Sequence, residues 1–114
     1  MCDTILQVHF YATASGDEPV RDWLRDLRRE DRRAIGEDIK TVQFGWPLGM
    51  PLVRKMEAGL WEVRSRTSGG MARVLFTVSG STMVLLHGFV KKSAKTPSTD
   101  LKIAKQRRSE VHNG

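Results

Sequence analysis

Four stretches of the chain are predicted to be β-strands: three alternate hydrophobic and polar residues with the two-residue period of strands, and the fourth, Met83–Val90, is a short apolar run between a turn and a basic segment. The first runs from Thr4 to Ala12, near the start of the chain. The other three follow one another in the second half, at Leu60–Arg66, Ala72–Val78 and Met83–Val90. Short glycine-containing turns separate these three, which predicts two successive hairpins and a meandering sheet.

Between the first strand and the other three, the apolar spacing changes to that of helices. Ser15–Pro19 combines two acids with a proline and is typical of a helix start. One apolar helix face then follows, formed by Val20, Trp23, Leu24 and Leu27. We expect Arg28–Arg33 to be a charged hinge. Beyond it, a second helix ending near Gly45 is outlined by Ala34, Ile35, Ile39 and Val42.

The remaining segments complete the predicted order of elements. Trp46–Pro51 contains two prolines and cannot continue the helix, and Leu52–Met56 is either a short edge strand or part of the loop. A last helix is predicted to open with Thr96 as its cap and Pro97 as its first residue. Its inner face would carry Leu101, Ala104, Arg108 and Val111. The order β-α-α-β-β-β-α predicts an α+β fold, in which an N-terminal strand and an α-hairpin pack on a twisted, mainly antiparallel sheet with a C-terminal helix.

Length and composition indicate the number of domains and the cellular compartment. The 114 residues suit one domain spanning 1–114. The single cysteine, Cys2, excludes an intramolecular disulfide and fits a reducing environment. The longest apolar run, Met83–Val90, is far shorter than the ~20 residues that span a bilayer, and residues 1–10 lack the features of a signal peptide. We therefore expect a cytoplasmic protein that does not engage membranes.

Positive charge is concentrated in the second half of the chain. Residues 1–50 carry seven Lys or Arg against nine Asp or Glu, whereas residues 51–114 carry twelve against four. Within Gly59–Pro97 a single acid, Glu62, opposes six basic residues, which are Arg64, Arg66, Arg73, Lys91, Lys92 and Lys95. A sheet with this balance suits a phosphate backbone. The alternative is that the charge serves solubility alone.

Several kinds of chemistry have little support in the sequence. The three histidines, His9, His87 and His112, are far apart, no cysteine pair exists, and no carboxylate cluster lies in the sheet half. No metal site or other cofactor is therefore predicted. No serine nucleophile motif is present, and Ser68–Gly70 is too short for a phosphate-binding loop.

Basic residues on the sheet are the main candidates for a site. Arg73 lies inside a strand whose opposite face is aliphatic and aromatic, so we expect it to be half sheltered and suited to capturing a phosphate. A structural salt bridge to a helix carboxylate is the alternative. Arg64 and Arg66 project from one face of the neighbouring strand, where arginines can equally be solubilising.

The end of the last strand supplies further candidates. Lys91, Lys92 and Lys95 lie just before a helix start, where phosphate-binding groups gather, and close lysines lower one another's pKa. The alternative is a solvated lysine run. His87 lies in an apolar strand, and histidine is the side chain that changes charge near neutral pH. It is either an acid or base or a satisfied core residue.

With these residues in view, the chain resembles the phage-derived Gp49-like branch of the RelE/HigB toxin superfamily. The resemblance rests on Gly59–Arg66, on Arg73–Phe76, and on Leu85–Lys92 together with Lys95–Pro97. Glu18–Leu24 adds to it. It covers nearly the whole chain, and the Leu-His-Gly-Phe-Val-Lys-Lys run is its most specific part.

The resemblance implies a type II toxin that is a metal-independent, ribosome-dependent mRNA endonuclease leaving a cyclic phosphate and a 5′-hydroxyl. It also implies a cognate antitoxin, expected to be a helix-turn-helix protein. By position, the resemblance implies that Arg64 contacts the substrate, that Arg73 stabilises the transition state, and that Lys91 and Lys92 are the basic residues at the end of the last strand. From the residues themselves, we add His87 as an outside candidate for the acid or base, and Arg66 and Lys95 as further RNA-binding residues. Glu62 departs from the pattern because RelE has a lysine there, and Tyr11, the only tyrosine, cannot replace RelE's C-terminal one.

Two other functions remain open at this point. A ParE-like toxin of the same fold would inhibit DNA gyrase without cutting RNA. A nucleic-acid-binding phage accessory protein without enzymatic activity is the third reading. No general acid and base pair can be assigned from the sequence, which keeps both alternatives in view.

Overall fold

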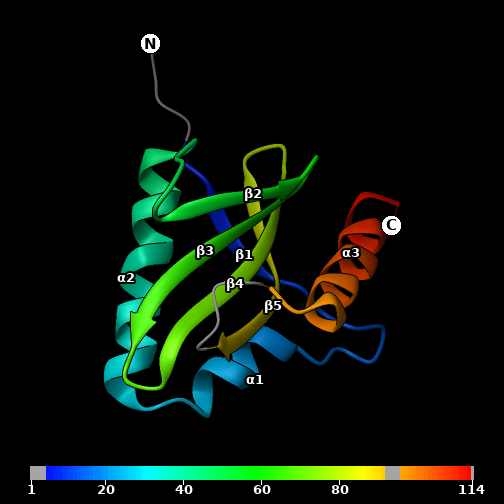
Figure 1. The fold of residues 1–114 in the computed structure, drawn as a ribbon. Helices are drawn as coiled ribbons and strands as arrows, with labels where there is room; N and C mark the ends of the chain where they lie inside the picture. The colour runs from blue at the N-terminus through cyan, green and yellow to red at the C-terminus, as the bar shows by residue number, and fades with distance from the viewer. Residues whose placement is uncertain (1–4, 92–95, 114) are drawn as a thin grey trace.

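A computed structural model describes residues 5–91 and 96–113 of the chain (Figure 1). Its strands are β1 (Gln7–Phe10), β2 (Val53–Glu57), β3 (Leu60–Thr67), β4 (Gly70–Ser79) and β5 (Thr82–Lys91). They form one sheet in the order β1-β5-β4-β3-β2, in which β1 is parallel to β5 and every other pair is antiparallel. The α+β fold predicted from the sequence is confirmed.

Helices cover both faces of this sheet. The helices α1 (Pro19–Arg25) and α2 (Arg29–Gly45) pack on one face, and α3 (Ser98–Asn113) packs on the other (Figure 1). Within the described residues, no helix has the length and apolar character needed to cross a membrane.

Alternation along β4 divides the core between the two faces. Val74 and Phe76 are buried in the core shared with α1 and α2, whereas Leu75 is buried in the core shared with α3. Ala104 of α3 lies in that second core, as its predicted inner face requires. The middle of β4 is therefore covered on both sides, and the polar side chains there, Arg73 and Thr77, are enclosed.

A β-bulge changes the side-chain direction partway along β5. Leu75 is paired with His87, but the next residue, Phe76, is paired with Leu85, so Leu86 is the extra residue. Leu85 lies in the core against α1 and α2, whereas Leu86 lies in the core against α3. Bulges re-aim side chains in this way, and here the bulge places His87 on the α3 side of the sheet.

Gly88 allows α1 to lie against β5. A Cβ atom built at Gly88 would lie 2.4 Å from Cε3 of Trp23, a separation that real contacts do not reach. Only a residue without a side chain leaves room for the indole at this point. The glycine in the Leu-His-Gly-Phe run is thus a packing requirement between α1 and the sheet.

Three local predictions are corrected or decided by the structure. Residues 29–33 belong to α2 and are not a hinge, because Glu30 and Asp31 in the first turn complement the helix dipole. Leu52–Met56, left open between strand and loop, corresponds to the edge strand β2. Thr96 does not cap α3 with its side chain but bonds to β3 and β4, and the helix begins after Pro97.

Candidate functional site

Three arginines lie on neighbouring strands of the face that α3 shares. Arg64 of β3 is directly opposite Arg73 of β4, and Arg54 of β2 is directly opposite Glu62 of β3. Like charges directly opposite each other destabilise a sheet, and one carboxylate offsets only part of this repulsion. An anion bound over these strands would relieve the rest, so the arrangement favours binding of an anion.

Arg73 lies at the buried end of this arginine group. It has 0% exposure, as does Glu62, and its Nη1 lies 3.9 Å from Glu62 Oε1. Thr96 links the two, since its hydroxyl accepts a bond from Arg73 Nη1 at 3.2 Å and donates one to Glu62 Oε2 at 2.6 Å. Burial lowers the pKa of Arg73, the charge of Glu62 opposes that shift, and the charges of Arg64 and Arg54 add to it.

The prediction of a half-sheltered Arg73 was therefore wrong. The strand pattern gives the face on which a side chain lies, but it does not show that Thr96, just before α3, contacts this position. The alternative of a salt bridge to a helix carboxylate was wrong as well, because the paired carboxylate, Glu62, comes from the neighbouring strand. Arg73 is held in a buried network with Glu62 and Thr96.

His87 makes a short hydrogen bond with an acid that sequence reasoning missed. Its Nε2 lies 2.6 Å from Oδ1 of Asp100, in the first turn of α3. The His87 and Asp100 side chains are 17% and 22% exposed, so the pair is sheltered but open to solvent. The ring of Phe89 lies 5.8 Å from the imidazole, centroid to centroid, and shields another side. A histidine held by a carboxylate in this way is suited to proton transfer.

The imidazole lies close to the arginine group. His87 is paired with Leu75, and Arg73 is paired with Phe89, so His87 and Arg73 are diagonal neighbours on one face of β4 and β5. Such neighbours have Cα atoms roughly 7–8 Å apart. One face of the sheet thus combines a positively charged group with an acid/base candidate.

The other predicted site residues take different positions. Arg64 is half-buried, and its Nε is buried without a hydrogen-bond acceptor among the described residues. Arg66 and Lys91 are exposed, and Lys91 ends β5. Lys92 and Lys95 lie outside the described residues. Within the described part of the chain, no group of three or more His, Cys, Asp or Glu could hold a metal ion.

Residues 22–109 match the sequence profile of a family described as phage derived protein Gp49-like (DUF891). This chain belongs to the phage-derived Gp49-like family. No match was found among curated proteins. The matched range begins inside α1 and ends inside α3, so it contains every residue of the site described above.

Two residues of this Gp49-like site were not predicted. Arg54 was overlooked because Leu52–Met56 could not be assigned to a strand. Without that assignment, the sheet face on which Arg54 lies could not be predicted. Asp100 is an acid in the first turn of a helix, a position usually explained by the helix dipole. Its pairing with His87 depends on where α3 lies and on the bulge in β5, and neither is visible in the sequence.

Proposed function

We propose that this Gp49-like protein belongs to the RelE/HigB superfamily and is the toxin of a type II toxin–antitoxin pair. Its activity would be metal-independent cleavage of mRNA on the ribosome, in the cytoplasm. The observation that carries the proposal is the His87–Asp100 pair, which lies on the same face of the sheet as the arginines of β2, β3 and β4. It supports His87, an outside candidate from the sequence, as the acid/base group of this proposal.

The chemistry is an in-line transfer within the RNA. The 2′-hydroxyl loses its proton and attacks the adjacent phosphorus, and the bond from phosphorus to the 5′-oxygen breaks. The departing 5′-oxygen takes up a proton from solvent, so the products are a 2′,3′-cyclic phosphate and a 5′-hydroxyl. When Nε2 of His87 donates to Asp100, Nδ1 carries the lone pair and can accept the proton of the attacking hydroxyl. Asp100 would fix this tautomer and stabilise the imidazolium that forms.

Charge stabilisation would come from the arginine group. Arg64 is half-buried and would contact the scissile phosphate, while the exposed Arg54, Arg66 and Lys91 would hold flanking phosphates. Arg73, enclosed with Glu62, would contribute its positive charge from beneath without touching the RNA. The cognate antitoxin, a helix-turn-helix protein in this proposal, would cover the same face.

The proposal is tested by inducing the protein in bacteria and mapping the 5′ ends of cellular mRNA. We expect new 5′-hydroxyl ends inside translated regions, and we expect His87→Ala to abolish them. His9→Ala is the matched control, because His9 is an exposed histidine on the edge strand β1, where its register partner is Val84 and not a residue of the site. Growth arrest with intact mRNA, or equal cleavage by the His87→Ala variant, would refute the nuclease proposal.

One observation favours the gyrase-inhibitor alternative. Arg73, the arginine expected to stabilise the transition state, is paired inside the protein with Glu62 and Thr96. A ParE-like inhibitor would need no catalytic arginine at the surface. Loss of DNA supercoiling with intact mRNA would support that function. A nucleic-acid-binding accessory protein would cause neither effect.

A further inference from the structure

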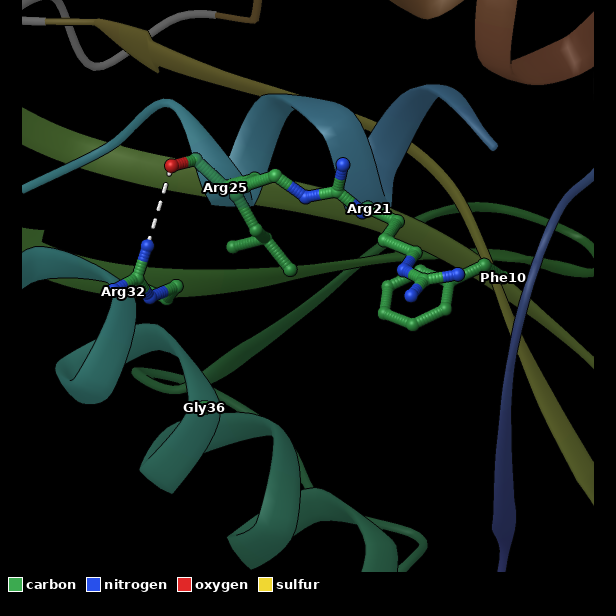
Figure 2. Close-up of a pocket in the computed structure, with 6 residues that line it drawn as sticks. Phe10, Arg21, Arg25, Arg32 and Gly36 are labelled. Carbon is green, nitrogen blue, oxygen red and sulfur yellow. Dashed lines mark hydrogen bonds between the residues drawn. The ribbon is translucent and has the colours of Figure 1, made fainter. Parts of the chain in front are cut away.

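A groove between α1 and α2 lies on the other side of the sheet from the candidate site. It has a volume of about 410 Å³ and is lined by Phe10, Arg21, Leu24, Arg25, Arg32 and Gly36. Figure 2 shows Arg21 and Arg25 on the α1 side of the groove and Arg32 reaching toward them from α2. Three of its six lining residues are therefore arginines.

The floor and one wall of this groove are apolar. Phe10 and Leu24 are partly buried and pack against the core beneath α1 and α2. On the α2 side, a Cβ atom built at Gly36 would have no atom within 4 Å, so the helix surface leaves open space there. The groove can thus receive an apolar side chain from outside.

The arginines around the groove are only partly neutralised. Arg21 forms an ion pair with Glu18 at 3.1 Å. Arg32 donates to the backbone carbonyl of Arg25 at 3.2 Å (Figure 2), which fixes its direction without cancelling its charge. Neither Arg25 nor Arg32 makes an ion pair with a described residue. The rim therefore carries positive charge beside an apolar floor.

We propose that this groove is a docking site for an acidic, amphipathic segment of a partner protein. Apolar side chains of the segment would pack on Phe10 and Leu24, and its carboxylates would pair with Arg25 and Arg32. Arginine forms such bidentate pairs readily and is enriched at protein interfaces. This proposal does not depend on the nuclease function, because the groove and the His87 site lie on opposite faces of the sheet.

The exposure of the groove favours a protein segment over two other ligands. Arg21, Arg25 and Arg32 are exposed, whereas a small-molecule site encloses most of its ligand. A protein segment brings its own surface and would bury these side chains on binding. RNA is less favoured because base stacking would have to use Phe10, whose ring is partly buried against the core.

The test is a titration of the whole protein with a synthetic amphipathic helix of leucine and glutamate, followed by NMR shifts of backbone amides. We expect shifts confined to α1, α2 and β1. Arg25→Glu and Arg32→Glu should each weaken binding roughly tenfold, the effect of losing about 1.4 kcal/mol. Arg33→Glu, the same charge change on an exposed α2 residue outside the groove lining, should leave the affinity unchanged.

Two further variants separate docking from non-specific attraction. Gly36→Leu fills the groove without altering charge, and it should weaken binding while the protein stays folded, because leucine favours a helix more than glycine does. A peptide with serine in place of leucine should bind more weakly than the original. The proposal would be overturned if Gly36→Leu bound the peptide as tightly as wild type, or if the serine peptide bound as tightly as the leucine peptide. Absence of binding, or tighter binding of a uridine oligonucleotide at the same residues, would also overturn it.

Discussion

Replacing Glu62 by glutamine would remove the carboxylate that is paired with buried Arg73. The side chains of Arg73 and Glu62 are only 1% and 0% exposed, so water cannot take the place of the lost charge. The amide oxygen of glutamine could still accept the hydrogen bond from Thr96, which in the native protein is 2.6 Å long. The change therefore removes the charge of Glu62 while keeping most of its shape.

The expected loss of stability is large for a single polar substitution. Removing one partner of a buried ion pair costs about 3–5 kcal/mol, because the other charge stays buried with less compensation. We expect the lower end of this range, since the bond to Thr96 can persist. At roughly 4 °C for each kcal/mol in a domain of this size, Glu62→Gln should lower the melting temperature by about 12 °C.

Urea and thermal unfolding followed by circular dichroism measure this loss. Glu37→Gln is the matched control, because Glu37 is exposed on α2, and its melting temperature should not change. The double variant Glu62→Leu with Arg73→Met should recover most of the lost stability, since replacing a whole buried pair by apolar groups is often neutral. An unaltered melting temperature for Glu62→Gln, or a double variant less stable than the single one, would refute the reasoning.

Two further predictions concern packing and pH. Gly88→Ala should destabilise the protein by about 1–3 kcal/mol through overpacking against Trp23. Gly49→Ala is the control and should leave the stability unchanged, because its added Cβ would meet nothing within 4 Å. Equal urea unfolding midpoints for the two variants would contradict this prediction. Hydrogen bonds and charges from two cations on α3 lower the pKa of Glu57, so its contribution is present above the ordinary pKa of glutamate and lost as pH falls through the lowered value. Urea midpoints of wild type and Glu57→Gln should therefore converge on acidification, and a constant difference across pH would contradict the assignment.

The strands of the second half of the chain were predictable because their residues alternate or, in Met83–Val90, form a short apolar run after a turn. The predicted Leu60–Arg66 and Met83–Val90 agree with β3 and β5 to within one residue at each end. The start of α2 was not predictable, because its first turn is charged on all sides and shows no apolar periodicity. Periodicity detects a helix only where the helix buries one face.

The candidate site was predictable only in part. That Arg64 and Arg73 share one face follows from strand alternation, and the register confirms that they lie opposite each other. The same alternation would place His87 on the face of Leu85, and the bulge at Leu86 reverses this. The pairing of His87 with Asp100 joins residues thirteen positions apart and depends on where α3 packs.

The central claim is that His87, held by Asp100, transfers the proton when RNA is cleaved. The most direct measurement is the single-turnover cleavage rate of mRNA bound to programmed ribosomes, compared between wild type and His87→Ala. General acid–base catalysis contributes about 10²–10⁴-fold, so His87→Ala should lower the cleavage rate by at least about 10²-fold while the variant still binds ribosomes. A His87→Ala rate equal to that of wild type would contradict the account.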